Sequence, residues 1–534
     1  MSIRVTVVSS LEKIFKNTAL QDTYDRLSLL KNERGSLQFA VVSDRDATVT
    51  VGMESPLPCR LYTVEEVPVG HAIYEHAQNC TVLNGGKSGN YPDPLFPCDG
   101  TLTLKAGIPA VVWAEFTGEL PGVHEPVFTV SDGKTAVRAQ ASVTVVKTAI
   151  PAQTLRHINW FHADCLANYY GVEVFSEEHW RIVENFMRDA AAHGVNVSFT
   201  PLFTPPLDTQ VGGERLTVQL VDVTKKGYTY TFGFDKLDRW IDAAARSGMK
   251  YYEFSHFFTQ WGARCAPKIM AQTSKGYRRI FGWENDSLSQ GYVSFLRQFG
   301  AALKEYTDKK GITDRCLVHC SDEPSMDNLN RYKKTAAVLH AYFGAYEHID
   351  ALSDFEFYKE GLIEIPVPNE HRVDQFAGKV PKLWTYYCGG QYNDELPNRF
   401  IAFPSIRNRI LGTLLYKFEC EGFLHWGYNF YNSQLSIRPL DPFKETDAGG
   451  AFPAGDGFVV YPGKNGEPMP SLRQKVFYDG IQDISALKAL EEKTSREHVL
   501  NVIKKELGEI DFTHYPMDNE RFLAFRSRVV NELA

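Results

Sequence analysis

The sequence predicts a protein of two parts, an N-terminal antiparallel β-sandwich over residues 1–150 and a (β/α)8 TIM-like barrel over residues 151–534. Two observations predict this multidomain β plus α/β fold class. Before residue 150, short segments that alternate apolar and polar residues are separated by Gly, Pro and Asp turns, as in β-sandwiches. Beyond it, apolar strand candidates alternate with stretches of helical spacing, and eight such strands fall between residues 157 and 428, as a barrel requires.

The N-terminal strands are expected where apolar and polar residues alternate. They are Ser36–Val42, Ala47–Val51, Gly100–Leu104, Ala110–Phe116, Val127–Val130 and Ala139–Val146. The stretch Tyr91-Pro92-Asp93-Pro94 is expected to be a loop of the sandwich that either packs against the barrel as a spacer or reaches its cleft. Residues 149–152, which include Pro151, are the predicted linker to the second part.

The barrel strands are expected at short apolar runs. They are His157–His162, Asn196–Thr200, Lys250–Phe254, Arg315–Cys320, Ile349–Asp354, Val373–Phe376, Lys382–Cys388 and Gly422–Tyr428. Helices are expected between them at Glu177–His193, Lys236–Ser247, Leu288–Thr307, Asn328–Phe343 and Asn398–Tyr416. Two further helices, Leu472–Glu491 and Ser495–Leu507, are expected to close the chain.

Composition is that of an ordinary globular protein, with 534 residues, a formal net charge of −8 and no run of Lys or Arg. This charge pattern gives no support for nucleic acid or an anionic membrane as a partner. The N-terminal residues lack an apolar signal core, and no stretch of about twenty apolar residues is present. We therefore expect a cytoplasmic protein, unless a signal segment has been removed. The nine cysteines show no CxxC spacing and are expected to be reduced thiols. Nothing in the sequence indicates an oligomeric state.

Two adjacent carboxylates, Asp322 and Glu323, follow the apolar run 315–320, and Pro324 ends that run. By strand count they lie at the carboxyl end of the fourth barrel strand, where barrel enzymes carry their catalytic groups. The pattern therefore indicates acid–base chemistry. The alternative is that Asp322 caps the helix that begins near Met326 and Glu323 is a solvated turn residue.

Aromatic and polar side chains follow several other predicted strands. A sugar ring has flat apolar faces edged by hydroxyls, so its pocket needs aromatic platforms and a few polar groups. The candidates for substrate binding are Glu253, His256, Trp261, Trp384, Tyr386, Trp426, Tyr428 and Asn429. For each of them the alternative is packing inside the barrel or a satisfied polar network at its mouth. Asp456, between two glycines, is either a residue of a loop over the cleft or part of a plain tight turn.

With these motifs the chain resembles glycoside hydrolase family 123, including relatives that share only its C-terminal pattern. The resemblance rests on stretches that span nearly the whole chain: Gly89–Leu95, Glu253–Trp261, Cys320–Pro324, Trp384–Tyr387, Trp426–Asn429, Gly455–Gly463, Ser471–Arg473 and Asp479–Asp483. It implies a retaining β-N-acetylgalactosaminidase (β-N-acetylhexosaminidase type) that acts on an oligosaccharide or glycoconjugate. Its adjacent Asp-Glu pair matches Asp322 and Glu323.

The resemblance also implies substrate-assisted catalysis, in which the substrate's 2-acetamido oxygen attacks its own anomeric carbon and forms an oxazolinium intermediate. Glu323 would protonate the leaving oxygen and later deprotonate water, and Asp322 would hold the acetamide N–H. For these roles Glu323 has to be protonated near neutral pH and Asp322 has to be ionised. Tyr386, Tyr428 and Asn429 are the candidates for holding Asp322 ionised.

No cofactor and no metal are expected, because the sequence has no GxGxxG after a strand, no GxxxxGK[ST] and no HExxH. Two alternatives to the hexosaminidase stay open at this point. One is a glycosidase of the same architecture that acts on another sugar, with Asp322 and Glu323 in the ordinary two-carboxylate roles. The other is a catalytically silent carbohydrate-binding protein.

Overall fold

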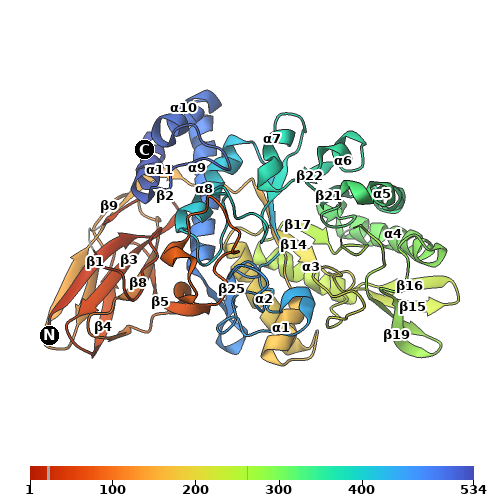
Figure 1. The fold of residues 1–534 in the computed structure, drawn as a ribbon, viewed down its shortest axis with the longest axis horizontal. Coiled ribbons are helices and arrows are strands. Elements are labelled where there is room, and N and C mark those ends of the chain that lie inside the picture. The colour runs from red at the N-terminus through yellow and green to blue at the C-terminus, as the bar shows by residue number, and fades with distance from the viewer. Residues whose placement is uncertain (21–23, 261) are drawn as a thin grey trace.

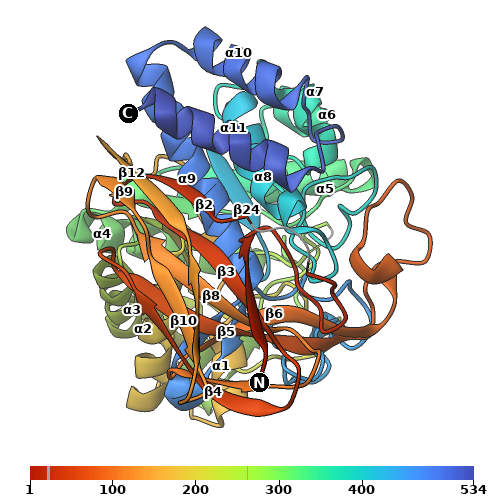
Figure 2. The same cartoon turned by 90° about the vertical axis from the view of Figure 1, so that its left-hand side faces the viewer.

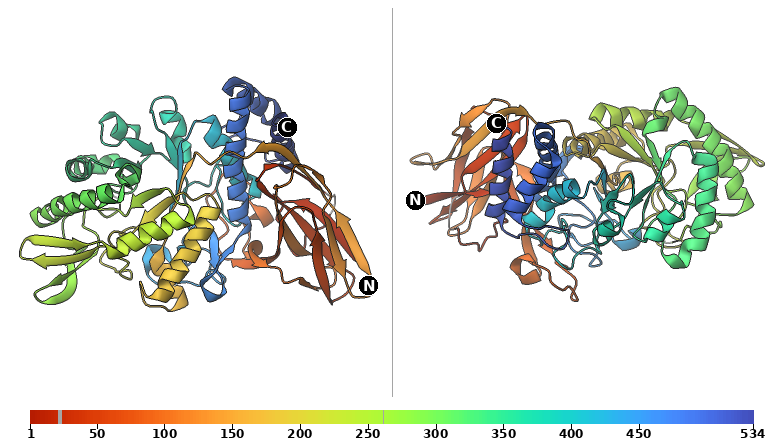
Figure 3. Two further views of the ribbon diagram at one scale, coloured as in Figure 1. Left: turned by 180° about the vertical axis from the view of Figure 1, so that it is seen from behind. Right: turned by 90° about the horizontal axis from the view of Figure 1, so that it is seen from above.

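The computed structural model describes residues 1–20, 24–260 and 262–534. A β-rich region formed by the first 149 residues lies at one end of the molecule, and an eight-stranded parallel sheet with surrounding helices occupies the other (Figure 1). The C-terminal helices α9 (Leu472–Lys493), α10 (Arg496–Leu507) and α11 (Asn519–Glu532) lie where the two meet (Figure 3). Among the described residues, no helix combines the length and apolar character needed to cross a bilayer.

The β-rich region contains three sheets, seen from their end of the molecule in Figure 2. Their strand orders are β1-β3-β8-β5-β6, β11-β10-β4-β7 and β2-β12-β9. The strands are β1 (Ile3–Ser9), β2 (Arg26–Lys31), β3 (Arg34–Ser43), β4 (Ala47–Glu54), β5 (Cys59–Val69), β6 (Gly89–Pro97), β7 (Thr101–Leu104), β8 (Ala110–Thr117), β9 (Gly122–His124), β10 (Val127–Ser131), β11 (Ala136–Gln140) and β12 (Ser142–Ala149). The rings of Phe39 in β3 and Phe128 in β10 stack at 4.6 Å and join the five-stranded sheet to the four-stranded one.

All six N-terminal segments expected from alternation overlap strands of this region. One of them, 139–146, is divided, because β11 ends at Gln140 and β12 begins at Ser142. The stretch expected to be a loop, residues 91–94, is part of strand β6. A strand with three prolines is tolerated there because β6 lies at the edge of its sheet.

Strand β6 packs against the second part of the chain. Asp93 is fully buried and accepts hydrogen bonds from Nε and Nη2 of Arg473 in α9, both at 2.9 Å. The Tyr461 hydroxyl donates to the same carboxylate at 2.6 Å. Of the two roles considered for the Tyr91–Pro94 stretch, the structure shows packing between the two parts.

The parallel sheet has the order β22-β21-β20-β17-β14-β13-β24-β23. Its strands are β13 (Arg156–Asn159), β14 (Val197–Thr200), β17 (Tyr251–Phe254), β20 (Cys316–Val318), β21 (Glu347–Ala351), β22 (Ile365–Val367), β23 (Trp384–Tyr386) and β24 (Gly422–His425). The sheet is nearly closed, because the Tyr386 N–H donates to the Pro368 carbonyl, just beyond β22, at 3.1 Å. All carboxyl ends of its strands therefore face the same rim.

The predicted sixth strand, Val373–Phe376, is wrong. These residues form the short helix α7, and the sixth strand is β22. Val373 and Phe376 are both buried, three positions apart, which is the spacing of one helical face. Four residues are too few to distinguish helical from strand periodicity. The observed strand β22 is hard to recognise because Pro366 lies within it and Pro368 follows it, and proline is rare inside sheets.

The remaining elements complete the architecture. The helices are α1 (Ala163–Tyr170), α2 (Glu177–Ala192), α3 (Asp235–Ser247), α4 (Gln290–Lys310), α5 (Leu329–Phe343), α6 (Phe355–Lys359), α7 (Val373–Phe376) and α8 (Ser405–Lys417). A small sheet is formed by β15 (Asp222–Lys226), β16 (Thr229–Gly233), β18 (Ile269–Thr273) and β19 (Gly276–Phe281), and β25 (Val460–Pro462) pairs with β26 (Pro468–Pro470). The small sheet and α11 were not expected from the sequence, whereas each predicted helix overlaps an observed one.

Helices α8 and α9 pack closely because glycines face each other. A Cβ atom on Gly412 would lie 2.0 Å from the Gly480 carbonyl oxygen. Arg409 of α8 donates to Asp479 at 2.9 Å and to Asp483 at 2.7 Å in α9. The Asp479–Asp483 motif therefore joins the two helices.

Candidate active site

A cavity of about 190 Å3 opens at the carboxyl rim of the parallel sheet. Residues at or just beyond the ends of five strands line it: Trp160 after β13, Asp322 and Glu323 after β20, Ala351 in β21, Tyr386 in β23, and Leu424 and Trp426 in and after β24. Loops supply the rest of the lining, namely Tyr74, Asp208, Gln260, Cys388, Gly389, Gly390, Phe452 and Asp456. The cavity thus combines four carboxylates with aromatic rings.

The chain turns sharply at the acidic pair. Glu323 has a φ of 42°, a left-handed conformation that costs a non-glycine residue about 1 kcal/mol or more. Two backbone contacts to β21 hold the turn: the Ser321 N–H donates to Oδ2 of Asp350 at 3.1 Å, and the Glu323 N–H donates to the Ala351 carbonyl at 2.9 Å. The turn leaves Asp322 half-buried and Glu323 exposed in the same cavity.

Tyr386 is the hydrogen-bond partner of the exposed acid. Its hydroxyl donates to Oε1 of Glu323. Burial and the charge of Glu323 raise the pKa of Tyr386 well above its usual value, so the hydroxyl keeps its proton and acts as a donor. The candidate donor to Asp322 is therefore bonded to Glu323.

The pKa of Asp322 is raised well above its usual value. Burial is the main cause, and the negative charges of Glu323, Asp208 and Asp350 add to it, while His319 opposes it. Burial and these negative charges therefore favour the neutral form of Asp322. Because two adjacent acids interact, they titrate as a pair.

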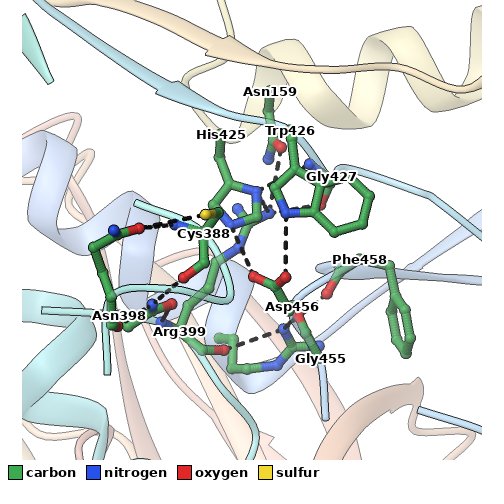
Figure 4. A network of polar contacts seen from close by, with 12 residues as sticks. Asn159, Cys388, Asn398, Arg399, His425, Trp426, Gly427, Gly455, Asp456 and Phe458 are labelled. Atoms are coloured by element: carbon green, nitrogen blue, oxygen red, sulfur yellow. Dashed lines mark hydrogen bonds and ion pairs between the residues drawn. The ribbon is translucent and has the colours of Figure 1, made fainter. Parts of the chain in front are cut away.

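Asp456 lies on the cavity wall within a polar network (Figure 4). Its Oδ2 accepts a hydrogen bond from the Trp426 indole at 3.2 Å, and its Oδ1, which has no hydrogen-bond partner among the described residues, lies 3.7 Å from Nε2 of His425. Arg399 and the Gly427 N–H both approach Nδ1 of His425, so that nitrogen is the acceptor and the ring proton sits on Nε2, toward Asp456. Burial raises the pKa of Asp456 to about 7, although Arg399 and Trp426 oppose the shift.

Asp208 is the fourth acid of the cavity. Its backbone N–H donates to Oε1 of Gln260 at 2.7 Å, and its φ is 48°. Burial raises the pKa of Asp208 to about 6, with Arg215 opposing and Glu323 adding to the shift. Neither Asp208 nor Gln260 was expected at the site from the sequence.

Glu253 and His256 lie beneath the cavity rather than on its wall. Glu253 is fully buried, and its Oε1 accepts from the Trp160 indole at 2.9 Å and lies 2.7 Å from Nε2 of His319. His256 is 1% exposed, and neither ring nitrogen has a hydrogen-bond partner among the described residues. Neither residue lines the cavity, and of the two only Glu253 has polar contacts of this kind.

Only some of the aromatic and amide candidates line the cavity. Tyr386 and Trp426 line the cavity. Trp384 is buried against Gly422, where a Cβ atom would lie 2.0 Å from its indole. The Tyr428 hydroxyl donates to Asp189 of α2 at 2.7 Å. Asn429 exchanges hydrogen bonds with the backbone of His162. These three side chains do not line the cavity, and Trp261 lies outside the described residues.

One wall of the cavity comes from the N-terminal region. Residues 70–88, which connect β5 and β6, bring Tyr74 to the cavity. The Tyr74 ring lies 4.8 Å from that of Tyr392, in the loop after β23, and the Gln78 N–H donates to the Asn393 side chain at 2.7 Å. No spacing in the sequence signals a contact between residues more than 300 positions apart.

A candidate for metal binding lies near the buried network. His256, His319 and Asp350 each offer a ligand atom within 4.8 Å of the others. However, His319 already directs Nε2 to Glu253 at 2.7 Å and Nδ1 to Asp350 at 3.4 Å. Among the described residues neither His319 nitrogen has a hydrogen-bond partner. Both nitrogens nevertheless lie near carboxylate oxygens, and this arrangement fits a protonated ring between two acids.

Comparison with known proteins bears on the family and the fold of the chain. The family model described as "Glycoside hydrolase 123, catalytic domain" matches residues 160–490. A family 123 glycoside hydrolase from Clostridium perfringens, described for glycolipid glycan hydrolysis, has a similar fold, with a TM-score of 0.75, 15% identity, and coverage of 99% of this chain and 98% of that one.

More distant solved structures include Bacteroides uniformis β-glucuronidase 3, with a TM-score of 0.32, 11% identity, and coverage of 90% of this chain and 51% of that one. No curated protein sequence matches the chain. The family model matches more than half of the chain and includes the acidic pair, so the protein belongs to glycoside hydrolase family 123.

Proposed function

We propose that the protein is a retaining β-N-acetylhexosaminidase that removes β-linked N-acetylgalactosamine by substrate-assisted catalysis. The observation that carries the proposal is the placement of Asp322 and Glu323. They are consecutive in the chain, yet one is half-buried and the other exposed in the same cavity. The less exposed carboxylate suits the C2 substituent of a bound sugar, and the exposed one suits the leaving group and the incoming water.

In the first step the acetamide oxygen of the substrate attacks C1, and the bond from C1 to the leaving oxygen breaks. Glu323 gives its proton to that oxygen, while Asp322 accepts a hydrogen bond from the acetamide N–H as positive charge develops on the oxazolinium. In the second step water attacks C1, Glu323 takes a proton from it, and the acetamide is restored. Tyr386 stabilises Glu323 in its ionised form between the two steps.

Substrate binding in this proposal changes the protonation of the pair. Burial and the neighbouring negative charges favour the neutral form of Asp322. An acetamide N–H and a developing positive charge both favour its ionised form, so the proton moves to Glu323 as the substrate enters. One carboxyl then donates and the other accepts, as the reaction requires.

Other groups of the cavity suit a single sugar ring. Trp426 and Tyr74 offer aromatic faces, and Asp456 and Asp208 are acceptors for sugar hydroxyls. In this interpretation the parallel sheet and its helices form a (β/α)8 barrel and the β-rich region a sandwich beside it. Trp384, Tyr428, Asn429, Glu253 and His256 position the residues that touch the sugar.

A comparison of three substrates tests the proposal. Turnover of nitrophenyl β-N-acetylgalactosaminide, with much slower turnover of the plain β-galactoside, is expected, and a thiazoline mimic of the oxazolinium should inhibit. The β-N-acetylglucosaminide reports on the 4-hydroxyl. Efficient cleavage of the plain β-galactoside would point to a glycosidase with two-carboxylate chemistry, and binding without turnover would point to a carbohydrate-binding protein. The Clostridium perfringens relative makes a glycolipid glycan the natural substrate to try next.

A further inference from the structure

Three charged side chains from neighbouring strands meet beneath the acidic pair. His319, which follows β20, lies between Glu253 of β17 and Asp350 of β21, at 2.7 Å and 3.4 Å. All three side chains are fully buried. A charge in such a place is tolerated only when it is paired, so the two carboxylates favour a proton on His319.

The bridge is connected to the catalytic turn through Asp350. The Oδ1 of Asp350 faces His319, and its Oδ2 accepts from the Ser321 N–H at 3.1 Å and from the Tyr332 hydroxyl of α5 at 2.6 Å. Ser321 immediately precedes Asp322. The next residue of β21, Ala351, holds the Glu323 N–H. The orientation of Asp350 therefore determines where the strained turn at Glu323 is held.

The bridge also acts on the charge of the pair. The negative charges of Glu323, Asp208 and Asp350 raise the pKa of Asp322, and the charge of His319 lowers that pKa. Burial by itself would lower the pKa of His319, but Glu253 and Asp350 outweigh it and raise the value to about 9. His256, whose ring lies 4.5 Å away, is kept neutral by burial and by His319.

We propose that His319, held as an imidazolium between Glu253 and Asp350, is a positioning residue that fixes the Ser321–Glu323 turn and keeps Asp322 able to ionise. The inference rests on the proposed function, because it assigns a role to His319 in that same reaction. It adds a buried bridge of three residues to the two acids that touch the substrate.

Two variants that change the charge of the bridge in opposite directions test this role. The reaction needs the pair with one proton, because Glu323 donates while Asp322 accepts, so kcat/KM falls as the pH drops and the second carboxyl becomes protonated. The acidic limb is the pH range in which kcat/KM falls as the pH drops. His319→Gln removes a positive charge and should move this limb to higher pH by about half a unit or more. Asp350→Asn removes a negative charge and should move it to lower pH. Shifts of opposite sign are not expected from a general loss of packing. Unchanged limbs in both variants, or shifts in the same direction, overturn the proposal.

A matched control is His348→Gln. His348 is a buried histidine of the same strand as Asp350, but its Nε2 contacts the Phe343 carbonyl at 3.2 Å, and burial lowers its pKa to about 4. It should leave the acidic limb in place even if it lowers the melting temperature. A shift of the limb in this control equal to that of His319→Gln contradicts a specific role for the bridge.

The wild-type protein gives a readout that does not depend on turnover, and the variant serves only to assign the signal. In 15N-histidine NMR, His319 should keep both ring protons at pH 8, and its signal should be absent from the His319→Gln spectrum. A neutral His319 ring at pH 7 overturns the proposal even if the enzyme is active. A protonated ring in a protein that cleaves none of the three glycosides means instead that the proposed function has failed, and with it the catalytic role of His319.

Discussion

The hydroxyl of Tyr386, at the end of β23, donates a hydrogen bond to Oε1 of Glu323, in the turn after β20. The two strands are not neighbours in the sheet, so this bond crosses the mouth of the cavity. The bond connects Glu323, the proposed acid and base, to the Tyr386 hydroxyl, which keeps its own proton. The first two predictions follow from it.

Glu323→Gln should lower kcat/KM by about 10²- to 10⁴-fold on substrates with poor leaving groups, because the amide cannot protonate the departing oxygen. A dinitrophenyl glycoside, whose leaving group needs no protonation, should lose much less in its first step. Steady-state kinetics on both substrates check this, with the melting temperature as a control for folding. Equal losses on both substrates would argue against Glu323 as the acid.

Tyr386→Phe should lower kcat/KM by roughly 10- to 100-fold, since a hydrogen bond to a charged group contributes about 1.5–3 kcal/mol. The neighbouring Tyr387 offers a matched control. It is fully buried, and its hydroxyl has no hydrogen-bond partner among the described residues, so Tyr387→Phe should change kcat/KM little. Similar losses in the two variants would assign the effect to packing.

Asp456→Asn should raise KM about tenfold with a smaller effect on kcat, because a hydroxyl loses a charged acceptor worth about 1.4 kcal/mol. The pH dependence gives the sharper test. The pKa of Asp456 is raised to about 7, so the carboxylate is present above that pH and lost below it. The KM of the wild type should fall as the pH rises through 7, and the KM of the variant should not. A pH-independent wild-type KM is the contrary result.

Asp93→Asn should lower the melting temperature by several degrees. Asp93 and Arg473 form a buried pair between β6 and α9, and removing one partner of such a pair costs about 3–5 kcal/mol. The exposed pair of Asp46 and Lys105 is the control, and Asp46→Asn should leave the melting temperature unchanged within error. Thermal unfolding by circular dichroism measures both. Equal shifts in the two variants would show that burial of the pair is not the cause.

Sequence alone could place the acidic pair, because a buried strand that ends at a proline locates its last residues in any parallel sheet. It could not separate Trp384 from Trp426, since both belong to predicted strand ends. The difference lies in a partner: Gly422 of the next strand leaves space that the Trp384 indole fills. Such a pairing depends on strand register, which the sequence of either strand does not reveal.

The same limit applies to the acids of the cavity. Asp208 and Asp456 belong to loops without a regular period, so nothing local distinguishes them from solvated turn residues. Their raised pKa values come from burial by distant segments. Nothing in the sequence singles out His319, because its two acidic neighbours are 66 and 31 positions away.

Tyr74 brings the N-terminal region to the wall of the cavity. The acids are carried by the parallel sheet, but a ring from the other end of the molecule closes one side of the space in which the sugar has to fit. An isolated fragment of residues 151–534 would therefore keep its acids and lose a boundary of its binding space. Under the proposed function, we expect changes in the connection between β5 and β6 to alter which glycans are accepted while the acids keep their roles.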